Sequence, residues 1–506
     1  MTAERPSLRF DQAPADPVDK WADDDKPREE CGVFGVFGSE DASVLTALGL
    51  HGLQHRGQEG CGIVSYDGRF HHERHLGLVG EHFSGENMPH RLPGTSAIGH
   101  TRYATQGGTI LRNVQPLFAD LALGGFAVAH NGNLTNARDL RERLVEAGAI
   151  FQSTSDTECI LQLIAKSRKA KVVERFVEAL HQIEGAYALV ALTNNMMIGA
   201  RDPVGIRPLV LGERDGSPIL ASETCALDMI GARFVRTIEP GEVITITRHM
   251  GEITIDSHFP FPRRQARSCL FEFVYFARPD SVVDGRSVYD VRKRMGHRLA
   301  QETGVEADVV VPVPDSGVPS AMGYALESGI PYELGIIRSH YAGRTFIQPK
   351  QEIRQLGVRL KHAANREVLK GKRVVLVDDS IVRGTTSRKI VQMVREAGAA
   401  EVHFRSASPP IKFPDFYGID MPSVDQLMAA QMTLEEMRKS LGVDSLGFLS
   451  VEGLYAAMGA ELRNAAEPQF TDHCFTGEYP TTLTDHASDR ADKDFQLSLL
   501  AENAAE

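Results

Sequence analysis

Hydrophobic and polar positions follow two different patterns along the chain, and the change falls near residue 260. Before it, the glycine-rich apolar run at 31–38 predicts a strand, and the segment 243–255 alternates on both sides of a Met-Gly pair, which predicts a hairpin. Apolar residues at helical spacing over 172–183 predict an amphipathic helix. This mixture of short strands and helices is typical of an α+β domain.

After residue 260, continuous β-branched runs replace the short strands. The runs at 309–313 and 374–377 are each followed by a polar or glycine-bearing turn and then by a helical pattern, as in the strands of a parallel α/β sheet. The Pro- and Arg-rich stretch 258–268 predicts a linker between the two halves. We therefore expect a leader at 1–30, an α+β domain at 31–262, an α/β domain with C-terminal helices at 263–485, and a polar tail at 486–506.

Charge and composition exclude several classes of protein. The 506 residues include 55 Lys and Arg against 67 Asp and Glu, a net charge of −12 without a basic block, which argues against a surface that follows a nucleic-acid backbone. No apolar run reaches the roughly 18 residues that a membrane span requires, and the first 30 residues lack the apolar core of a signal peptide. Six scattered cysteines do not resemble a secreted disulfide framework. We therefore predict a cytoplasmic enzyme.

The segment 374–391, VVLVDDSIVRGTTSRKIV, carries the strongest signal for a ligand site. Its predicted strand delivers Asp378 and Asp379 to a carboxyl end, where open α/β sheets bind their ligands. The Arg-Gly-Thr-Thr at 383–386 then opens a helix, whose N–H groups and hydroxyls suit a phosphate. Since adjacent carboxylates repel a bare phosphate, they indicate sugar hydroxyls and a bound Mg²⁺. Alone, the acid pair would more simply be a solvated turn that caps a helix.

This segment resembles the phosphoribosyl-diphosphate (PRPP) loop of the type I phosphoribosyltransferases. Residues 312–321 resemble the pyrophosphate loop of that family, and the basic stretch 338–351 resembles its mobile loop, which closes over the substrate. A cationic lid neutralises diphosphate and excludes water, although an exposed basic loop would carry the same residues. The resemblance assigns PRPP binding to Asp378, Asp379, Ser380, Arg383, Gly384, Thr385, Thr386, Ser316, Gly317, Arg338, Arg344 and Lys350, and one Mg²⁺ per subunit to Ser316, Asp378 and Asp379.

The first half offers a candidate nucleophile in Cys31, although a lone cysteine is more often an inert core residue. Polar, glycine-rich segments at 51–62, 99–107, 129–134 and 153–158 stand where strands are expected to end. With Cys31 they resemble the glutamine amidotransferase domain of the N-terminal-nucleophile class, which has four αββα layers. In such a domain the leader is removed, and the free α-amino group of the cysteine, with a pKa of about 7.7 to 8.0, serves as the base.

The same resemblance distributes roles among the residues of those segments. Cys31 is expected to attack the glutamine carboxamide, while the Asn131 side chain and the Gly132 N–H form the oxyanion hole. Arg102 is expected to bind the substrate α-carboxylate and Asp156 its α-amino group. Thr105 and Arg56 are expected to support this site. The local pattern around Asn131-Gly132 predicts a tight hairpin turn, which is also the simplest interpretation of that pair taken alone.

Together, residues 31 to about 480 resemble the glutamine phosphoribosylpyrophosphate amidotransferase family. The resemblance implies that glutamine is hydrolysed at Cys31 and that ammonia crosses an internal channel to C1 of PRPP. The products are 5-phosphoribosylamine, glutamate and pyrophosphate, in the first committed step of purine synthesis. It also implies purine nucleotide inhibitors and a homodimer or homotetramer, with no nucleic-acid or membrane partner.

Two alternatives remain at this stage. Another glutamine amidotransferase, such as a hexosamine synthase, would not explain the segment 374–386. A regulatory protein that binds PRPP without turnover would not need Cys31, Arg102, Asn131 and Asp156 together.

One departure from the family concerns its iron–sulfur cluster. Some members hold a [4Fe–4S] cluster through four cysteines, and here Asp415 and Thr471 stand at two of those positions, while Cys269 and Cys474 remain at the others. Because four thiolates are the usual requirement, we predict no cluster. Asp415 with the two remaining thiols is left open as a site for some other metal.

Overall fold

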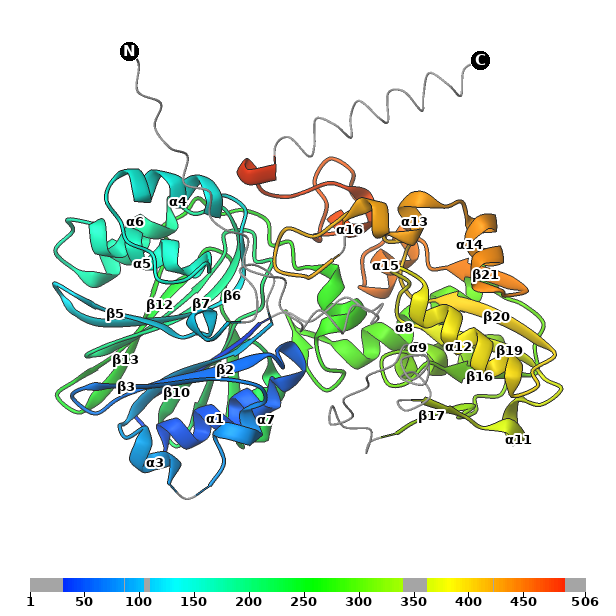
Figure 1. Ribbon diagram of the computed structural model, residues 1–506, viewed down its shortest axis with the longest axis horizontal. Helices are drawn as coiled ribbons and strands as arrows, with labels where there is room; N and C mark the ends of the chain where they lie inside the picture. The colour runs from blue at the N-terminus through cyan, green and yellow to red at the C-terminus, as the bar shows by residue number, and fades with distance from the viewer. Residues whose placement is uncertain (1–30, 86, 104–109, 340–361, 422, 487–506) are drawn as a thin grey trace, which may run out of the picture.

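The computed structural model describes residues 31–85, 87–103, 110–339, 362–421 and 423–486. Figure 1 shows two halves side by side, the first in blue to green and the second in green to orange. The first half contains two β-sheets that pack face to face, and helices cover both outer faces. The second half is built on a smaller parallel sheet. The predicted order, an α+β domain in four layers and then an α/β domain, is confirmed.

The two sheets of the first half bury an apolar layer between them that includes Val33, Ala127, Val190, Leu220 and Ile244. Among the described residues, one sheet has seven strands in the order β11 (Arg233–Thr237), β9 (Val210–Arg214), β10 (Ser217–Ala221), β1 (Gly32–Phe37), β4 (Ser96–Arg102), β2 (Gly60–Tyr66), β3 (Phe70–Leu76). The other, over the same described ranges, has six, in the order β13 (Glu252–His258), β12 (Val243–His249), β8 (Met196–Arg201), β7 (Gly185–Thr193), β6 (Gly124–Leu134), β5 (Leu117–Leu121).

Helices on the two outer faces complete the layers. The seven-stranded sheet is covered by α1 (Ala42–Gly52), α2 (Val79–His82), α3 (Met88–Arg91) and α7 (Thr224–Met229). The six-stranded sheet is covered by α4 (Ala137–Glu146), α5 (Thr157–Lys166) and α6 (Val172–Leu180). The amphipathic helix predicted over 172–183 is confirmed as α6, which buries Phe176, Ala179 and Leu180.

Local turn chemistry confirms one prediction of the first half and overturns another. Met250 and Gly251 both take a positive φ, 49° and 91°, and join β12 to β13 in the predicted hairpin. The predicted tight turn at 129–134 is wrong, because β6 runs straight through it. Asn131 pairs with Ala188 and Gly132 with Tyr187 on the fully buried strand β7. Because β6 stays paired with β7 as far as Leu134, the chain remains extended here and the Asn-Gly pair does not form a turn.

The second half places its strands as the sequence predicts. The strands β16 (Val309–Pro312), β19 (Arg373–Asp378), β20 (Glu401–Ser406) and β21 (Ser445–Phe448) are parallel neighbours in that order. Short antiparallel pairs are β14 (Val282–Val283) with β15 (Arg286–Ser287), and β17 (Ile336–Arg338) with β18 (His362–Ala364). The helices are α8 (Val288–Thr303), α9 (Val318–Ser328), α11 (Arg366–Leu369), α12 (Thr385–Glu396), α13 (Met428–Gln431), α14 (Leu434–Leu441), α15 (Val451–Ala457) and α16 (His473–Thr476).

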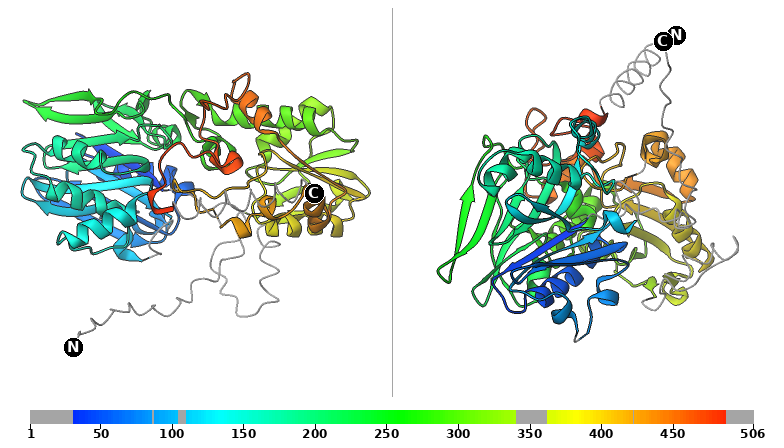
Figure 2. Two further views of the ribbon diagram at one scale, coloured as in Figure 1. Left: turned by 90° about the horizontal axis from the view of Figure 1, so that it is seen from above. Right: turned by 60° about the vertical axis from the view of Figure 1, so that its left-hand side comes forward.

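The two halves share a core and are joined by the C-terminal segment. Ala186, Val204 and Ile206 of the first half belong to the same apolar cluster as Phe271 and Phe273 of the second. Of the predicted linker 258–268, His258 ends β13 and residues 259–268 form no helix or strand. In the views of Figure 2 the segment around α16, coloured orange to red, lies between the halves.

Hydrogen bonds fix this segment to the first half. The Thr135 hydroxyl donates to the Thr482 carbonyl at 2.8 Å. The Asp485 carboxylate accepts the N–H groups of Arg138 and Asp139 at 2.7 and 3.1 Å.

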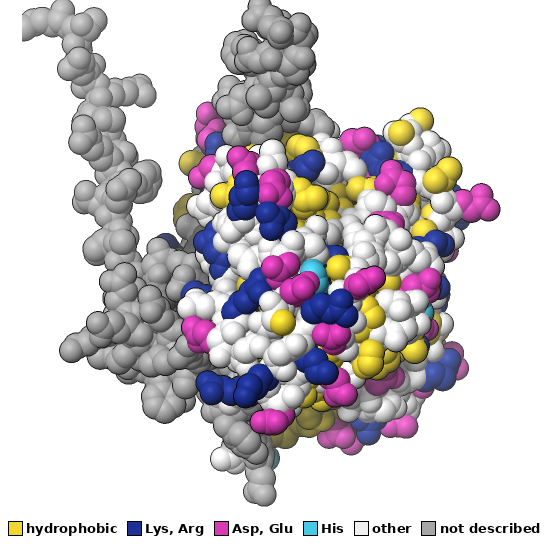
Figure 3. Space-filling view, turned by 90° about the vertical axis from the view of Figure 1, so that its right-hand side faces the viewer, with side chains coloured by type: hydrophobic (Ala, Val, Ile, Leu, Met, Phe, Trp, Pro, Cys, Tyr) yellow, Lys and Arg dark blue, Asp and Glu magenta, His cyan; other side chains and the backbone are white. Residues whose placement is uncertain are grey.

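The outer surface carries mixed charge. On the face shown in Figure 3, over the end of the second half, Lys and Arg side chains alternate with Asp and Glu, and apolar side chains stand in small groups. This face presents no continuous basic surface of the kind that nucleic acids bind. None of the helices in the described ranges combines the length and apolar character that crossing a bilayer requires.

Candidate active sites

Cys31 lies at the start of β1, in the middle of the seven-stranded sheet. Because Gly32 pairs with Thr101 on β4, Cys31 is brought next to Arg102 and Tyr103. Its thiol donates to the Tyr103 carbonyl at 3.5 Å. Burial raises the pKa of the Cys31 thiol, although the Arg102 charge and the Tyr103 hydrogen bond act in the opposite direction. The thiol is therefore protonated at neutral pH and needs a base before it can attack.

The other sheet supplies Asn131 and Gly132, both on β6. The Asn131 amide Nδ2 approaches the Ser222 hydroxyl at 3.5 Å, and the same hydroxyl oxygen accepts the Val33 N–H at 3.0 Å. Ser222 thus bridges Asn131 to the strand that begins beside Cys31. Sequence reasoning missed Ser222, since nothing in its neighbourhood marks it and only the packing of the two sheets brings it here.

Asp156 precedes α5 and reaches the same strand. Its carboxylate accepts the Leu134 N–H at 3.0 Å and the Thr157 N–H at 2.8 Å, so it both caps α5 and ties it to the end of β6. His130 Nδ1 lies 3.6 Å from the carboxylate. Burial lowers the pKa of His130 against the opposing influence of Asp156. Asp156 therefore places a carboxylate at the end of the strand that carries Asn131 and Gly132.

Arg56 does not stand free to meet a substrate. It is fully buried, and its guanidinium donates to the carboxylates of Glu223 and Glu272. Burial by itself would raise the pKa of Glu223, but His55 and Arg56 outweigh this and hold the pKa well below its usual range. Arg207 Nη1 also donates to Glu272, at 3.3 Å. Arg56 thus belongs to a buried ion-pair network between the halves. Its expected supporting role at the glutamine site stays a prediction, and Thr105 lies outside the described residues.

The predicted PRPP loop lies at the carboxyl end of β19, as expected. Asp378 ends the strand and Asp379 follows, each only 1 % exposed. The Asp378 carboxylate accepts the Asp379 N–H at 2.9 Å, and the Asp379 carboxylate accepts the Ser380 hydroxyl at 2.6 Å. Gly384 has a φ of +76° at the start of α12, where a Cβ atom would lie 2.4 Å from Met428 Sδ. Glycine is therefore required at this turn.

Other loop residues follow directly. Arg383 Nε donates to the Gln426 amide oxygen at 3.2 Å, while Thr385 and Thr386 open α12. These side chains come from one short stretch of chain, so the local strand–turn–helix geometry alone brings them together.

A second loop crosses this edge of the sheet. The Val313 N–H donates to the Val377 carbonyl at 2.8 Å, and a Cβ atom on Gly317 would lie 2.4 Å from that same carbonyl oxygen. Ser316 and Gly317 therefore lie beside the end of β19, next to Asp378. The Gly317 N–H, expected to face pyrophosphate, donates instead to the Val313 carbonyl at 3.0 Å.

The β17–β18 pair leads to the predicted mobile loop. Arg338, on β17, forms an ion pair with Asp315 of the pyrophosphate loop, and His362 Nε2 lies 3.3 Å from the Pro314 carbonyl oxygen. Arg338 and His362, on the strand pair β17–β18, therefore both contact the pyrophosphate loop. Arg344 and Lys350 lie outside the described residues.

A buried polar cluster contains Asp415 and Cys474, two of the positions that the resemblance assigns to an iron–sulfur cluster. His473 Nε2 lies 2.7 Å from the Asp415 carboxylate and 3.2 Å from Cys474 Sγ. Cys269 pairs with Thr471 through a bridge of parallel backbone. Burial raises the pKa of Cys269 to about 12 and, together with the Asp415 charge, raises that of Cys474 well above its usual value.

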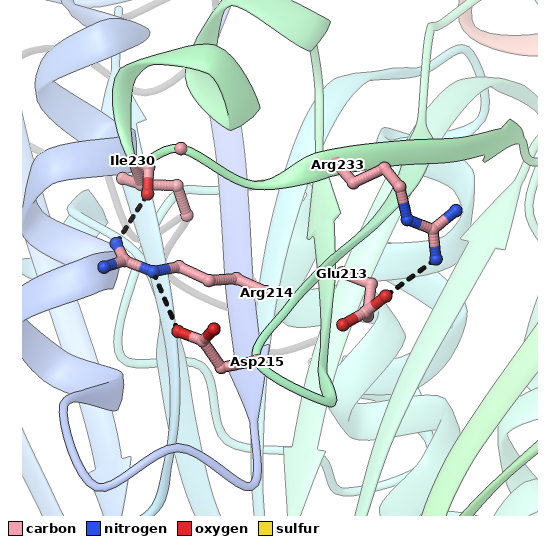
Figure 4. Close-up of a pocket in the computed structure, with 6 residues that line it drawn as sticks. Glu213, Arg214, Asp215, Ile230 and Arg233 are labelled. Carbon is pink, nitrogen blue, oxygen red and sulfur yellow. Dashed lines mark hydrogen bonds and ion pairs between the residues drawn. The ribbon is translucent and has the colours of Figure 1, made fainter.

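A surface hollow of about 390 Å³ lies elsewhere, along the outer strands β9 and β11. Figure 4 shows that its charged side chains are paired, with Arg214 bonded to Asp215 and the Ile230 carbonyl, and Arg233 bonded to Glu213. None of the residues that line it is a candidate site residue.

Comparison with known proteins gives two family matches. Residues 100–229 match the glutamine amidotransferase domain, and residues 280–406 match the phosphoribosyl transferase domain. The amidophosphoribosyltransferase of Rhizobium etli is 60 % identical over 98 % of this chain and 100 % of its own length. That of Bacillus subtilis is 49 % identical over 90 % of this chain and 95 % of its own. The solved structure of the B. subtilis glutamine PRPP amidotransferase with ADP and GMP has a TM-score of 0.84 at 47 % identity, and covers 90 % of this chain and 98 % of that one.

Proposed function

Because the chain belongs to the amidophosphoribosyltransferase family, we propose that Cys31 and the Asp378-Asp379 loop are the centres of its two coupled reactions. The family reaction uses glutamine as the nitrogen source and PRPP as the acceptor, and forms 5-phosphoribosylamine in the first committed step of purine biosynthesis. The observation that supports the assignment of residues is the Ser222 hydroxyl, which joins Asn131 on one sheet to the Val33 N–H on the other, two residues from Cys31.

Glutamine hydrolysis begins with the transfer of the Cys31 thiol proton to its own α-amino group, which removal of residues 1–30 sets free. The thiolate attacks the carboxamide carbon, and the negative charge that develops on oxygen is stabilised by Asn131 Nδ2 and the Gly132 N–H. The ammonium-bearing terminus then protonates the leaving amine, which releases ammonia and leaves a glutamyl thioester. Water hydrolyses the thioester to glutamate. Arg102 holds the α-carboxylate of glutamine and Asp156 its α-amino group.

At the second site the proposed residues bind the ribose, the 5′-phosphate and the pyrophosphate of PRPP. Asp378 and Asp379 accept hydrogen bonds from the ribose hydroxyls. Ser380, Arg383, Gly384, Thr385 and Thr386 surround the 5′-phosphate at the start of α12. Ser316 and Gly317 contact the pyrophosphate, and Arg338, Arg344 and Lys350 supply positive charge to it. Ammonia attacks C1 as the bond to pyrophosphate breaks.

The residues at this edge also suit Mg²⁺. Two buried carboxylates and the Ser316 hydroxyl, on adjacent loops, form the all-oxygen donor set that this ion prefers. When bound, Mg²⁺ neutralises charge on the departing pyrophosphate.

The residues at the iron–sulfur position do not suit a [4Fe–4S] cluster. Two thiols remain of the four that are usually required, and the Asp415 carboxylate is hydrogen-bonded to His473 and to two backbone N–H groups. We therefore propose that this protein works without a cluster.

Two further properties are proposed by relation to the family. The B. subtilis enzyme binds ADP and GMP in its solved structure, and this supports purine nucleotides as inhibitors of this chain. We also propose that the active form is a homo-oligomer.

Pyrophosphate release tests the proposed function. Protein whose intact mass corresponds to a chain starting at Cys31 should release pyrophosphate from PRPP with glutamine or with ammonia, and should release none without PRPP. Binding of PRPP without pyrophosphate release from either nitrogen source would show that this is a PRPP-binding regulatory protein. Activity with ammonia alone, in a chain that retains residues 1–30, would leave the second site standing and refute the processing at Cys31.

A further inference from the structure

The Asp415 carboxylate closes a tight backbone turn over residues 415–419. One of its oxygens accepts the N–H groups of both Tyr417 and Ile419 at 2.7 Å, and the other lies 2.7 Å from His473 Nε2. Burial alone would raise the pKa of Asp415, but the hydrogen bond and charge of His473 outweigh it and lower the pKa. The turn is thus held by a buried, ionised side chain, and its shape depends on that charge.

The 415–419 turn is also fixed from outside. Backbone N–H groups of Lys412 and Phe413 donate to the Cys474 carbonyl at 3.0 and 3.1 Å. The Tyr417 hydroxyl lies 3.0 Å from that of Thr481. These bonds join the turn and the residues just before it to α16 and to Thr481. They restrict movement of the turn.

The turn contacts the predicted oxyanion hole of the first half through Gly418, which is buried. Gly418 has a φ of +121°, and a Cβ atom there would lie 3.1 Å from both Cα and the carbonyl carbon of Gly132. The neighbouring Asn133 amide donates to the Phe416 carbonyl at 3.0 Å. On the opposite side, a Cβ atom on Gly132 would lie 2.1 Å from the Ala186 carbonyl oxygen. Gly132 is therefore enclosed between the backbone of β7 and the 415–419 turn.

We propose that Asp415 is a positioning residue for glutamine hydrolysis. Asp415 closes the 415–419 turn, the turn holds Gly418 against Gly132, and this contact fixes the Gly132 N–H in the oxyanion hole. The inference rests on the proposed role of Gly132. A donor to a developing oxyanion must be placed within a fraction of an ångström, because misplacement by about 1 Å can lower a rate about 10²-fold.

Two variants test the proposal, Asp415→Asn and Gly418→Ala. The first removes the charge that holds the turn, and the second places a methyl group against Gly132. Both should lower the glutamine-dependent kcat about 10- to 100-fold, because oxyanion stabilisation is made in the transition state. The KM for glutamine and the rate with added ammonia should stay within about twofold, since neither depends on the oxyanion hole. Alkylation of Cys31 by iodoacetamide should be unchanged.

Gly459→Ala is the matched control. Gly459 also has a positive φ, +87°, in the second half, but a side chain there would meet no atom within 4 Å. This variant imposes similar backbone strain and should leave both activities at the level of the parent protein.

Three outcomes would contradict either the role of Asp415 or the proposed function. Variants with full glutamine-dependent turnover would overturn the inference and leave the proposed function intact. Glutamine- and ammonia-dependent rates that fall together, in proportion to the folded fraction, would also overturn it, because the residues would then be merely structural. A parent protein that uses ammonia but never glutamine would refute the proposed function of Cys31 itself.

Discussion

The two proposed active sites are built in opposite ways. The PRPP site takes Asp378, Asp379 and the 383–386 turn from one continuous stretch, where a buried strand ends and a helix begins. The glutamine site takes Cys31 from one sheet, Asn131 and Gly132 from another, and Asp156 from the start of a helix. The part of the first site at 378–386 is local, whereas the second site is assembled from segments far apart in the sequence. A change at the first should disturb one reaction, whereas the geometry of the second depends on how whole layers pack.

Cys31→Ala is expected to separate the glutamine-dependent activity from the ammonia-dependent activity most clearly. Loss of the nucleophile should lower glutamine-dependent turnover by about 10⁴-fold or more, since no other group in the mechanism can form the thioester. The ammonia-dependent rate should persist, because the second half is intact. Pyrophosphate release with each nitrogen source measures both. An equal loss with ammonia would show that the two sites are not separable.

A large effect on stability is expected where the halves meet. Arg56→Met leaves the buried carboxylates of Glu223 and Glu272 without their shared partner, which should lower the free energy of unfolding by about 3 to 5 kcal/mol. Urea denaturation followed by far-UV circular dichroism measures it. Arg233→Met, which removes an exposed pair with Glu213, is the control and should cost less than about 1 kcal/mol.

A substitution in the proposed PRPP site should lower both activities, unlike Cys31→Ala, which should lower only the glutamine-dependent one. Asp379→Asn removes one buried carboxylate from the ribose and metal position and should lower turnover about 10²- to 10³-fold with glutamine and with ammonia alike. Alkylation of Cys31 should not change. A titration with Mg²⁺ at saturating PRPP should show a raised half-saturating concentration. Loss of the glutamine-dependent rate alone would place Asp379 in the wrong reaction.

The smallest expected effect concerns the electrostatics of the buried nucleophile. Glu59 is among the charges that raise the pKa of Cys31. Glu59→Gln should therefore move the rise of the iodoacetamide reaction rate towards lower pH, by a fraction of a pH unit, because less of the thiol remains protonated. The direction is set by the sign of the charge removed. A shift towards higher pH would contradict it.

Several features could be predicted from sequence because they depend on neighbouring residues. The hairpin at Met250-Gly251 follows from local turn geometry. The PRPP loop follows from a strand, two acids and a helix start within about 20 residues, the scale on which hydrophobic periodicity and helix ends are visible. Cys31 could be identified only by resemblance, since its pattern alone fits a core thiol equally well.

The features that sequence reasoning missed are decided by contacts between distant parts of the chain. The pattern at 129–134 favours a turn, yet pairing with the buried strand β7 carries β6 through it. Ser222 joins the two sheets, and Arg56 is occupied by carboxylates from both halves. The 415–419 turn meets Gly132 across nearly 300 residues of chain. By itself the sequence determined the order of the domains and the local PRPP loop, because local backbone preferences suffice for these. Tertiary packing alone decided how the glutamine site is assembled and what holds it in place, because each of its contacts joins segments whose separation no local pattern encodes.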